Sequence, residues 1–196
     1  IRKQNFVISG TSGNINTNSK NIFSNNMMMR SDQGDVIKSK TGEGNFEKRE
    51  FKFDGNVNGK IRGNVKDFVA DPKKMVDSEA IYFRGNTAKV YFLVHKNKDY
   101  SVTRSEIKGN VNMNYKEINL NSQYNEIDTS KNLIMARDKV MMNFRGNTQM
   151  TSNFIYLDLN TEKGYAQNNV KIVSNIDGIG SVNISADKAT IDNKAR

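Results

Sequence analysis

The chain has 196 residues and a formal net charge of +9, from 30 Lys and Arg against 21 Asp and Glu. It has no Cys, which excludes a disulfide framework, a thiolate metal site and a cysteine nucleophile. Its apolar runs, such as Val90 to Val94, are far shorter than the roughly 18–20 residues of a membrane-spanning helix. The length predicts one domain or two very small ones.

Both ends suggest a piece of a longer product. Residue 1 is Ile, and no basic segment followed by an apolar one opens the chain. We therefore expect a mature or trimmed form, and a removed signal peptide or anchor would account for it. The stretch from Ile184 to Arg196 stops inside a repeat, so we expect a cut at the C-terminal end too.

With 36% hydrophobic residues and 29 Asn, the composition at first resembles that of a disordered chain. However, there is a single Pro, and the apolar residues alternate with polar ones along short segments. Alternation with a period of two is typical of half-buried strands. The segments with this pattern lie at 51–54, 111–115, 118–121, 140–144 and 182–186.

In the first half of the chain, a Gly-Asn pair precedes Val at 55–57 and at 63–65. Gly and Asn both tolerate a positive φ, so the chain can turn or bulge before Val restarts a strand. Plain hairpin turns are the alternative interpretation. The methionines at 27–29 and at 141–142 could line an adaptable apolar surface. The one candidate helix runs from Pro72 to Phe83, and a loop fits that segment equally well.

The second half of the chain repeats with a period of about 30 residues. Equivalent residues of the repeat are spaced by 29 or 30 positions, and each Val is followed two positions later by another apolar residue. The matched positions are Val111, Val140 and Val170, Ala136 and Ala166, and Asp128 and Asp158. Strands that recur every 8–12 residues between clusters of Asn, Gly, Asp and Lys predict an all-β sandwich, barrel or solenoid.

These repeats resemble the OstA-like superfamily, which includes the lipopolysaccharide-transport periplasmic proteins LptA and LptC. The clearest matches are the segments 165–172 (YAQNNVKI) and 184–192 (ISADKATID), and 42–46 leading to 53–57 is similar. The pattern departs from the usual Gly-Asn-Val at Asn168 and Lys139. The resemblance is good over residues 105–196 and weaker over 40–95.

The resemblance implies an antiparallel β-jellyroll, or β-taco, in which two sheets face each other, as a single domain over residues 1–196. It implies a periplasmic protein that shields the acyl chains of lipopolysaccharide or a related lipid in an apolar trough. An anchor in the inner membrane would have to come from a segment absent here. Its partners would be other OstA-like proteins, joined edge to edge, and the inner-membrane ABC transporter of the same pathway. No cofactor is implied.

Twelve residues are expected to face the interior of this trough and to bind lipid. They are Phe53, Val57, Phe83, Val111, Met113, Val140, Met142, Phe144, Leu157, Val170, Ile172 and Ile184. The alternative is that they fill a closed sandwich core. The Lys and Arg residues are interleaved along the chain, so they would either attract an anionic head group or only solubilise the protein.

An enzyme is not expected, since no nucleophile elbow, phosphate-binding loop or zinc-binding helix motif occurs. The lone His95 predicts neither a catalytic nor a metal site. A β-solenoid surface or adhesin-type protein is the main rival, and its coils would pair in parallel. A basic nucleic-acid-binding module is the weaker rival, with Tyr82-Phe83 and Tyr91-Phe92 as stacking candidates. Adjacent aromatics on one strand point to opposite faces, so we expect no nucleic-acid partner.

Overall fold

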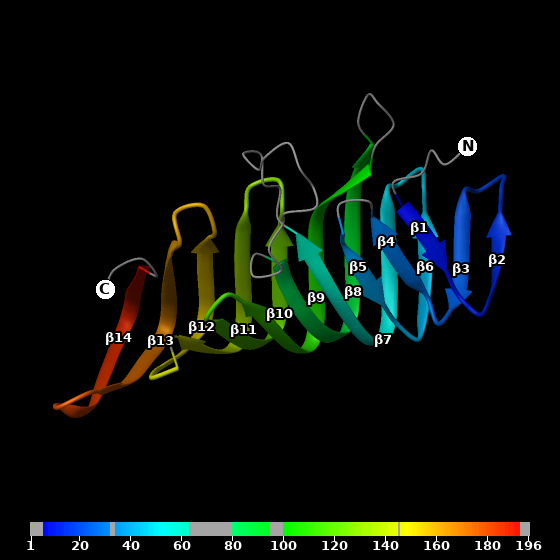
Figure 1. Ribbon diagram of the computed structural model, residues 1–196. Coiled ribbons are helices and arrows are strands. Elements are labelled where there is room, and N and C mark those ends of the chain that lie inside the picture. The colour runs from blue at the N-terminus through cyan, green and yellow to red at the C-terminus, as the bar shows by residue number, and fades with distance from the viewer. Residues whose placement is uncertain (1–5, 32–33, 63–79, 95–99, 145, 193–196) are drawn as a thin grey trace.

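The computed structural model describes residues 6–31, 34–62, 80–94, 100–144 and 146–192, and within them every regular element is a β-strand (Figure 1). No helix among these residues could cross a membrane. The strands are β1 (Phe6–Ser9), β2 (Ser12–Asn16), β3 (Asn21–Asn25), β4 (Met28–Ser31), β5 (Val36–Lys38), β6 (Thr41–Asn45), β7 (Glu50–Arg62), β8 (Ala80–Val94), β9 (Tyr100–Tyr115), β10 (Ile118–Asp128), β11 (Leu133–Phe144), β12 (Thr148–Asp158), β13 (Lys163–Ile176) and β14 (Gly180–Asp192).

The strands form one sheet in which every pair is antiparallel. From β7 to β14 each strand pairs with the next along the chain. Before β7 the sheet branches into two arms, β1-β4-β5 and β2-β3-β6, and both arms end on β7. The first half of β7 pairs with β6, and its second half pairs with β5. The long strands therefore contribute to both layers of the molecule (Figure 1).

A line of β-bulges, which we call the crease, runs across the long strands and separates the two layers. On every second strand, two residues with positive φ interrupt the ladder, and a single residue of the next strand lies opposite them. The crease pairs are Gly55-Asn56 on β7, Gly109-Asn110 on β9, Asp138-Lys139 on β11 and Asn168-Asn169 on β13. Bulges bend strands, so the sheet folds along this line.

The crease explains why the sequence tolerates Asp138 and Asn168 where other repeats have Gly. Lys139 stands at the second position of its pair, where the other three pairs have Asn. Asp138 and Lys139 have φ values of 63° and 53°, and Asn168 has a φ of 66°. Asp and Asn adopt this region more readily than other residues with a side chain, so they can replace Gly at modest cost. The Gly-Asn pairs at 55–56 and 109–110 are therefore bulges inside continuous strands, and the alternative of hairpin turns is wrong at 55–57. The pair at 63–64 lies outside the described residues.

Small side chains on the intervening strands face the crease from within. Ser122 on β10 and Ser152 on β12 are buried, and Gly85 holds the same place on β8. The Oγ atoms of both serines donate to the carbonyl two residues further on, at Tyr124 (3.2 Å) and Phe154 (3.1 Å). A larger side chain would have no room, since a Cβ at Gly85 would lie 2.5 Å from Ile107 Cγ2.

The repeating Asp residues cap the hairpin turns. Asp158 Oδ1 accepts hydrogen bonds from the backbone N–H groups of Asn160 (2.8 Å) and Thr161 (3.2 Å), and Asp128 Oδ1 accepts one from Lys131 N–H (3.1 Å). Such side-chain bonds replace the backbone partners that a tight turn leaves unmade. The 30-residue unit is thus one hairpin of two bent strands, with Asp at the turn and the bulge in the middle.

The prediction of an all-β antiparallel fold is confirmed, with two differences. The two facing layers are not separate sheets along β7–β14, because hydrogen bonding continues past the crease. The candidate helix is wrong at its C-terminal end, since Ala80 to Phe83 are the first residues of strand β8. The rest of that segment lies outside the described residues.

Candidate functional site

The interior between the two layers is the candidate site, because the apolar residues of both layers join there in one cluster. Nine of the twelve predicted trough residues are at most 3% exposed. They are Phe53, Val57, Phe83, Val111, Met113, Val140, Met142, Leu157 and Val170. Along most of its length the interior is therefore filled by the protein's own side chains. This packing favours the closed-core interpretation for these nine positions.

The other three predicted residues lie toward the C-terminal end of the interior. Phe144 on β11 and Ile172 on β13 are partly buried and pack against the cluster. Ile184 on β14 is 51% exposed. It nevertheless belongs to the inner face, because it lies directly opposite Ile172 in the β13–β14 ladder.

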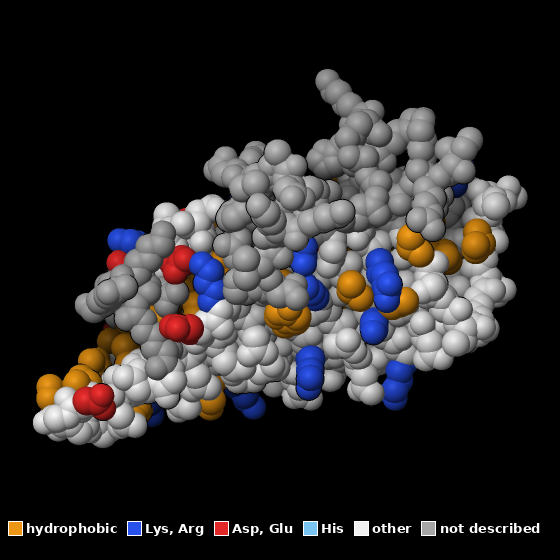
Figure 2. All heavy atoms as spheres, viewed as in Figure 1, with side chains coloured by type: hydrophobic (Ala, Val, Ile, Leu, Met, Phe, Trp, Pro, Cys, Tyr) orange, Lys and Arg blue, Asp and Glu red, His pale blue; other side chains and the backbone are white. Residues whose placement is uncertain are grey.

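The inner face is thus uncovered at the end formed by β13 and β14, which we call the open end. Ile176, on the same face of β13 as Ile172, is 42% exposed, and Val182 beside Ile184 is half-buried. Figure 2 shows hydrophobic side chains gathered where these two strands end. An apolar face that continues from a packed core into solvent is unusual for a soluble protein and indicates a binding surface.

Several core residues were absent from the predicted set although they obey the same alternation. Phe51, Ile107, Ile127 and Ile134 are all at most 1% exposed. The period-two pattern around each of them is the signal that would have found them. Of the methionines singled out, Met27 and Met29 are fully buried, while Met141 is 38% exposed on the outer face.

The outer face of one layer holds a partly buried carboxylate network on β9 and β10. Glu106 and Glu126 lie directly opposite each other, and Arg104 contacts both, through Nη2 to Glu106 Oε1 (3.1 Å) and through Nε to Glu126 Oε1 (2.9 Å). Tyr91 donates to Glu106, and Tyr124 donates to Glu126. The guanidinium therefore bridges the two carboxylates and offsets one of their two negative charges, which suits a structural role better than acid–base chemistry.

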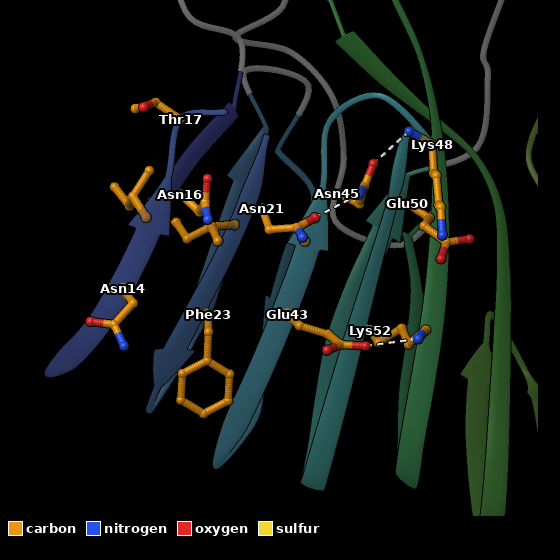
Figure 3. Close-up of a pocket in the computed structure, with 13 residues that line it drawn as sticks. Asn14, Asn16, Thr17, Asn21, Phe23, Glu43, Asn45, Lys48, Glu50 and Lys52 are labelled. Carbon is orange, nitrogen blue, oxygen red and sulfur yellow. Dashed lines mark hydrogen bonds and ion pairs between the residues drawn. The ribbon is translucent and has the colours of Figure 1, made fainter. Parts of the chain in front are cut away.

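A polar hollow lies on the outer face of β2, β3, β6 and β7 (Figure 3). Lys52 and Glu43 form an ion pair of 2.7 Å across it, and Asn45 caps the neighbouring turn through Lys48 N–H (2.7 Å). A hydrogen bond from Lys89 lowers the pKa of Glu50 at its rim. This hollow contains none of the predicted trough residues.

Two further predictions concern catalysis and metals. His95 lies outside the described residues. Within the described ranges, no group of three or more His, Asp and Glu residues could hold a metal ion. Of the proposed stacking residues, Phe83 and Phe92 are buried, whereas Tyr82 is 41% exposed, so each pair does point to opposite faces.

Comparisons with known proteins add little to this geometry. No family model and no curated protein matches the chain. A similar solved structure is that of LptH, the LptA homologous periplasmic component of the conserved lipopolysaccharide transport device from Pseudomonas aeruginosa. It is 9% identical, the match covers 85% of each chain, and the TM-score is 0.33. At this TM-score the likeness decides neither the family nor the function.

Proposed function

We propose that this protein binds lipopolysaccharide or a related acylated lipid at the inner face of its folded sheet and passes it along a periplasmic bridge. The observation that carries the proposal is the open end, where the apolar inner face leaves the packed core and meets solvent at Ile184. The resemblance of the repeats to OstA-like proteins supports lipopolysaccharide or a related lipid as the ligand and the periplasm as the compartment.

Acyl chains are the natural occupants of such a face. Burying each methylene is worth about 0.8 kcal/mol, so a chain of about twelve carbons gains about 10 kcal/mol of gross burial. Aliphatic side chains such as Ile172 and Ile184 provide this gain without directional hydrogen bonds. Deeper entry would require the two layers to separate around Met142 and Val140, which fill the interior now.

The sheet also has an edge suited to assembly. Within the described part of the chain, the 13-residue β14 pairs only with β13, so its outer backbone groups have no ladder partner there. A strand of another OstA-like protein could continue the sheet from β14 and extend the apolar face across the junction. We infer such an edge-to-edge neighbour, and an inner-membrane ABC transporter as the source of the lipid.

Two rival functions are less well supported. A β-solenoid adhesin would stack parallel coils, whereas all the described strand pairs are antiparallel. A nucleic-acid-binding module would need successive exposed aromatic side chains, and the inward orientation of Phe83 and Phe92 removes half of the candidates. We also propose that the protein is not an enzyme.

Photo-crosslinking in cells tests the proposal. A photoreactive residue at Ile184 should capture lipopolysaccharide, while one at Asn183, the outward-facing neighbour on the same strand, should not. A second pair, Met142 inside and Asn143 outside, reports whether lipid enters between the layers. Equal capture at Ile184 and Asn183, or silence at both Ile184 and Met142, would contradict lipid transport through the inner face.

A further inference from the structure

The outer face of the layer that contains β5 carries a second, polar recess, distinct from the inner face. It has a volume of about 440 Å³ and lies over β5, β7, β8 and β9. That volume falls within the range of about 300–1,000 Å³ typical of small-molecule sites. Among the described residues, three cationic side chains, Lys38, Lys60 and Arg84, line the recess together with one exposed aromatic ring, Tyr82, and no carboxylate.

Strand register fixes these side chains into two rows, which we call the basic grid. In the first row Lys38, Asn58, Arg84 and Asn112 lie opposite one another from β5 to β9. In the second row the corresponding residues are Val36, Lys60, Tyr82 and Asn114. Side chains opposite each other on neighbouring strands are about 4.5–5.5 Å apart at Cβ, so the grid is a compact, preformed surface.

The cations of the basic grid are suited to an anion. Lys38 and Arg84 are exposed and make no ion pair within the described ranges. Arg84 offers a planar fork of donors that matches a carboxylate or a phosphate. The Nζ atom of Lys60 lies 5.5 Å from the centroid of the Tyr82 ring, which holds the ammonium group beside the aromatic surface.

A ring of four asparagine side chains continues the basic grid onto β10. Asn112 Nδ2 donates to Asn121 Oδ1 (2.9 Å), and Asn121 Nδ2 donates to Asn119 Oδ1 (3.0 Å). Asn119 Nδ2 donates to Asn114 Oδ1 (2.6 Å), and Asn114 Nδ2 returns to Asn112 Oδ1 (3.1 Å). Each amide has two N–H donors and two lone pairs, so each retains one donor and one acceptor for a ligand. The ring also fixes the orientation of the amides in advance.

We propose that the basic grid binds an anionic saccharide, a sugar that carries a phosphate or a carboxylate. Arg84 and Lys38 would bind the charged group, and the oriented amides of Asn112 and Asn114 would pair with hydroxyl groups, which are also donors and acceptors at once. The exposed Tyr82 ring would pack on the C–H groups of the sugar through the negative face of its π system. A single-stranded nucleic acid would instead need a series of exposed rings, and Tyr82 is the one exposed aromatic residue lining the recess.

Such a saccharide could be the head group of a glycolipid or part of a free polysaccharide. Calorimetric titration of the intact chain at low ionic strength separates these sources, with deacylated lipopolysaccharide oligosaccharide as one probe and tetragalacturonate as the other. Neither probe has acyl chains, so neither depends on the open end. Binding of either probe through the basic grid supports the proposal, and the tighter one identifies the source, whether or not lipid transport is correct.

Three variants distinguish specific binding at the basic grid from nonspecific attraction by the net charge. Arg84→Ala should weaken binding of the better probe about tenfold, as loss of one charge-assisted contact would. Lys171→Ala removes an exposed cation from the same outer face on β13, beyond the grid, and should change affinity less than about twofold. Tyr82→Ala should weaken saccharide binding at least about fivefold while leaving weak binding of inorganic phosphate unchanged. Thermal melts check that each variant is folded.

Several outcomes would overturn the proposal. Absence of binding by both probes would do so directly. Equal losses for Arg84→Ala and Lys171→Ala would indicate diffuse attraction by the net charge. If neutral maltotetraose bound as tightly as the anionic probes, the cations would have no role in binding. If Tyr82→Ala did not change saccharide affinity, the grid would be a site for anions and not for sugars. Tighter binding of a thymidine dodecamer than of either saccharide probe would assign the grid to nucleic acid.

Discussion

Ile172 and Ile184 face each other across the β13–β14 ladder, but Ile172 packs against the core while Ile184 is 51% exposed. The inner face of the sheet therefore changes character from one strand to the next. This transition separates residues that stabilise the fold from residues that are available to a ligand. The two groups can be distinguished by how much a substitution changes the free energy of unfolding.

The first prediction compares the same substitution at two depths of the inner face. Ile107→Ala should lower the free energy of unfolding by about 2–5 kcal/mol, because Ile107 is fully buried and the truncation leaves a cavity. Ile184→Ala should cost less than about 1 kcal/mol, because half of its surface is already in water. Urea unfolding of both variants measures the two costs. Comparable costs would mean that Ile184 is covered in solution, for example by a second copy of the chain.

The second prediction concerns the crease at Gly109. Its φ is +75°, and an added Cβ would lie 2.5 Å from Asn86 Nδ2, on the preceding strand β8. Gly109→Ala should therefore cost about 1–3 kcal/mol, combining backbone strain with displacement of Asn86. Gly146 is the matched control, because it has a φ of +72° with nothing near the added Cβ.

Gly146→Ala should cost only the strain, about 1 kcal/mol. Chemical denaturation of both variants gives the difference that is due to the crease contact. If Gly146→Ala were the more costly change, the packing across the bulge would not be what requires glycine at position 109.

Alternation and spacing were enough to predict an all-β fold and the inward orientation of nine core residues. Phe53 and Val57 were placed on one face although a bulge lies between them, because they are four residues apart and the alternation of buried and exposed positions on β7 continues through the bulge. The bulge itself was predicted only as one of two choices, since Gly-Asn is equally at home in a hairpin turn. Whether a Gly-Asn pair forms a hairpin turn or a bulge depends on the strand that pairs with it, and the local sequence does not contain that information.

The open end and the basic grid could not be predicted from the sequence, because both are formed by pairing between strands that are distant along the chain. Ile184 has the same local pattern as Val140, and only its place on the last described strand leaves it exposed. Lys38, Arg84 and Asn112 are separated by long stretches of chain and come together through register. In the sequence, these residues are recognisable only as scattered charges and as part of a large number of asparagines. The periodicity of a strand shows which face a residue lies on, but it does not show which strands lie beside it.

The third prediction concerns the turn cap at Asp158. Asp158→Ala should lower the free energy of unfolding by about 1 kcal/mol, because two backbone N–H groups in the turn lose their acceptor. Asp158→Asn retains a side-chain oxygen and should cost only a few tenths of a kcal/mol. Thermal unfolding of the two variants is the measurement. Equal losses would show that the carboxylate charge, and not the turn hydrogen bonds, supplies the stabilisation.

The fourth prediction concerns pH and Asp35, which is 3% exposed between β4 and β5. Its carboxylate accepts hydrogen bonds from Ser31 Oγ (2.8 Å) and from the backbone N–H of Arg62 (2.8 Å). Burial nevertheless raises the pKa of Asp35 above its ordinary value of 3.8. The folded protein therefore binds a proton at Asp35 at a pH where the unfolded chain has lost it.

This raised pKa fixes the sign of the effect. Stability contributed by Asp35 is fully present below about pH 3.8 and is lost as the pH rises through the higher pKa of the folded state. The unfolding free energy of the wild-type protein minus that of Asp35→Asn should therefore increase as the pH falls from 7 to about 4. Urea unfolding of both proteins at several pH values measures this difference, in which the contributions of the other carboxylates cancel. A difference that shrinks toward acid pH would mean that the hydrogen bonds from Ser31 and Arg62 outweigh burial and that the pKa of Asp35 is lowered.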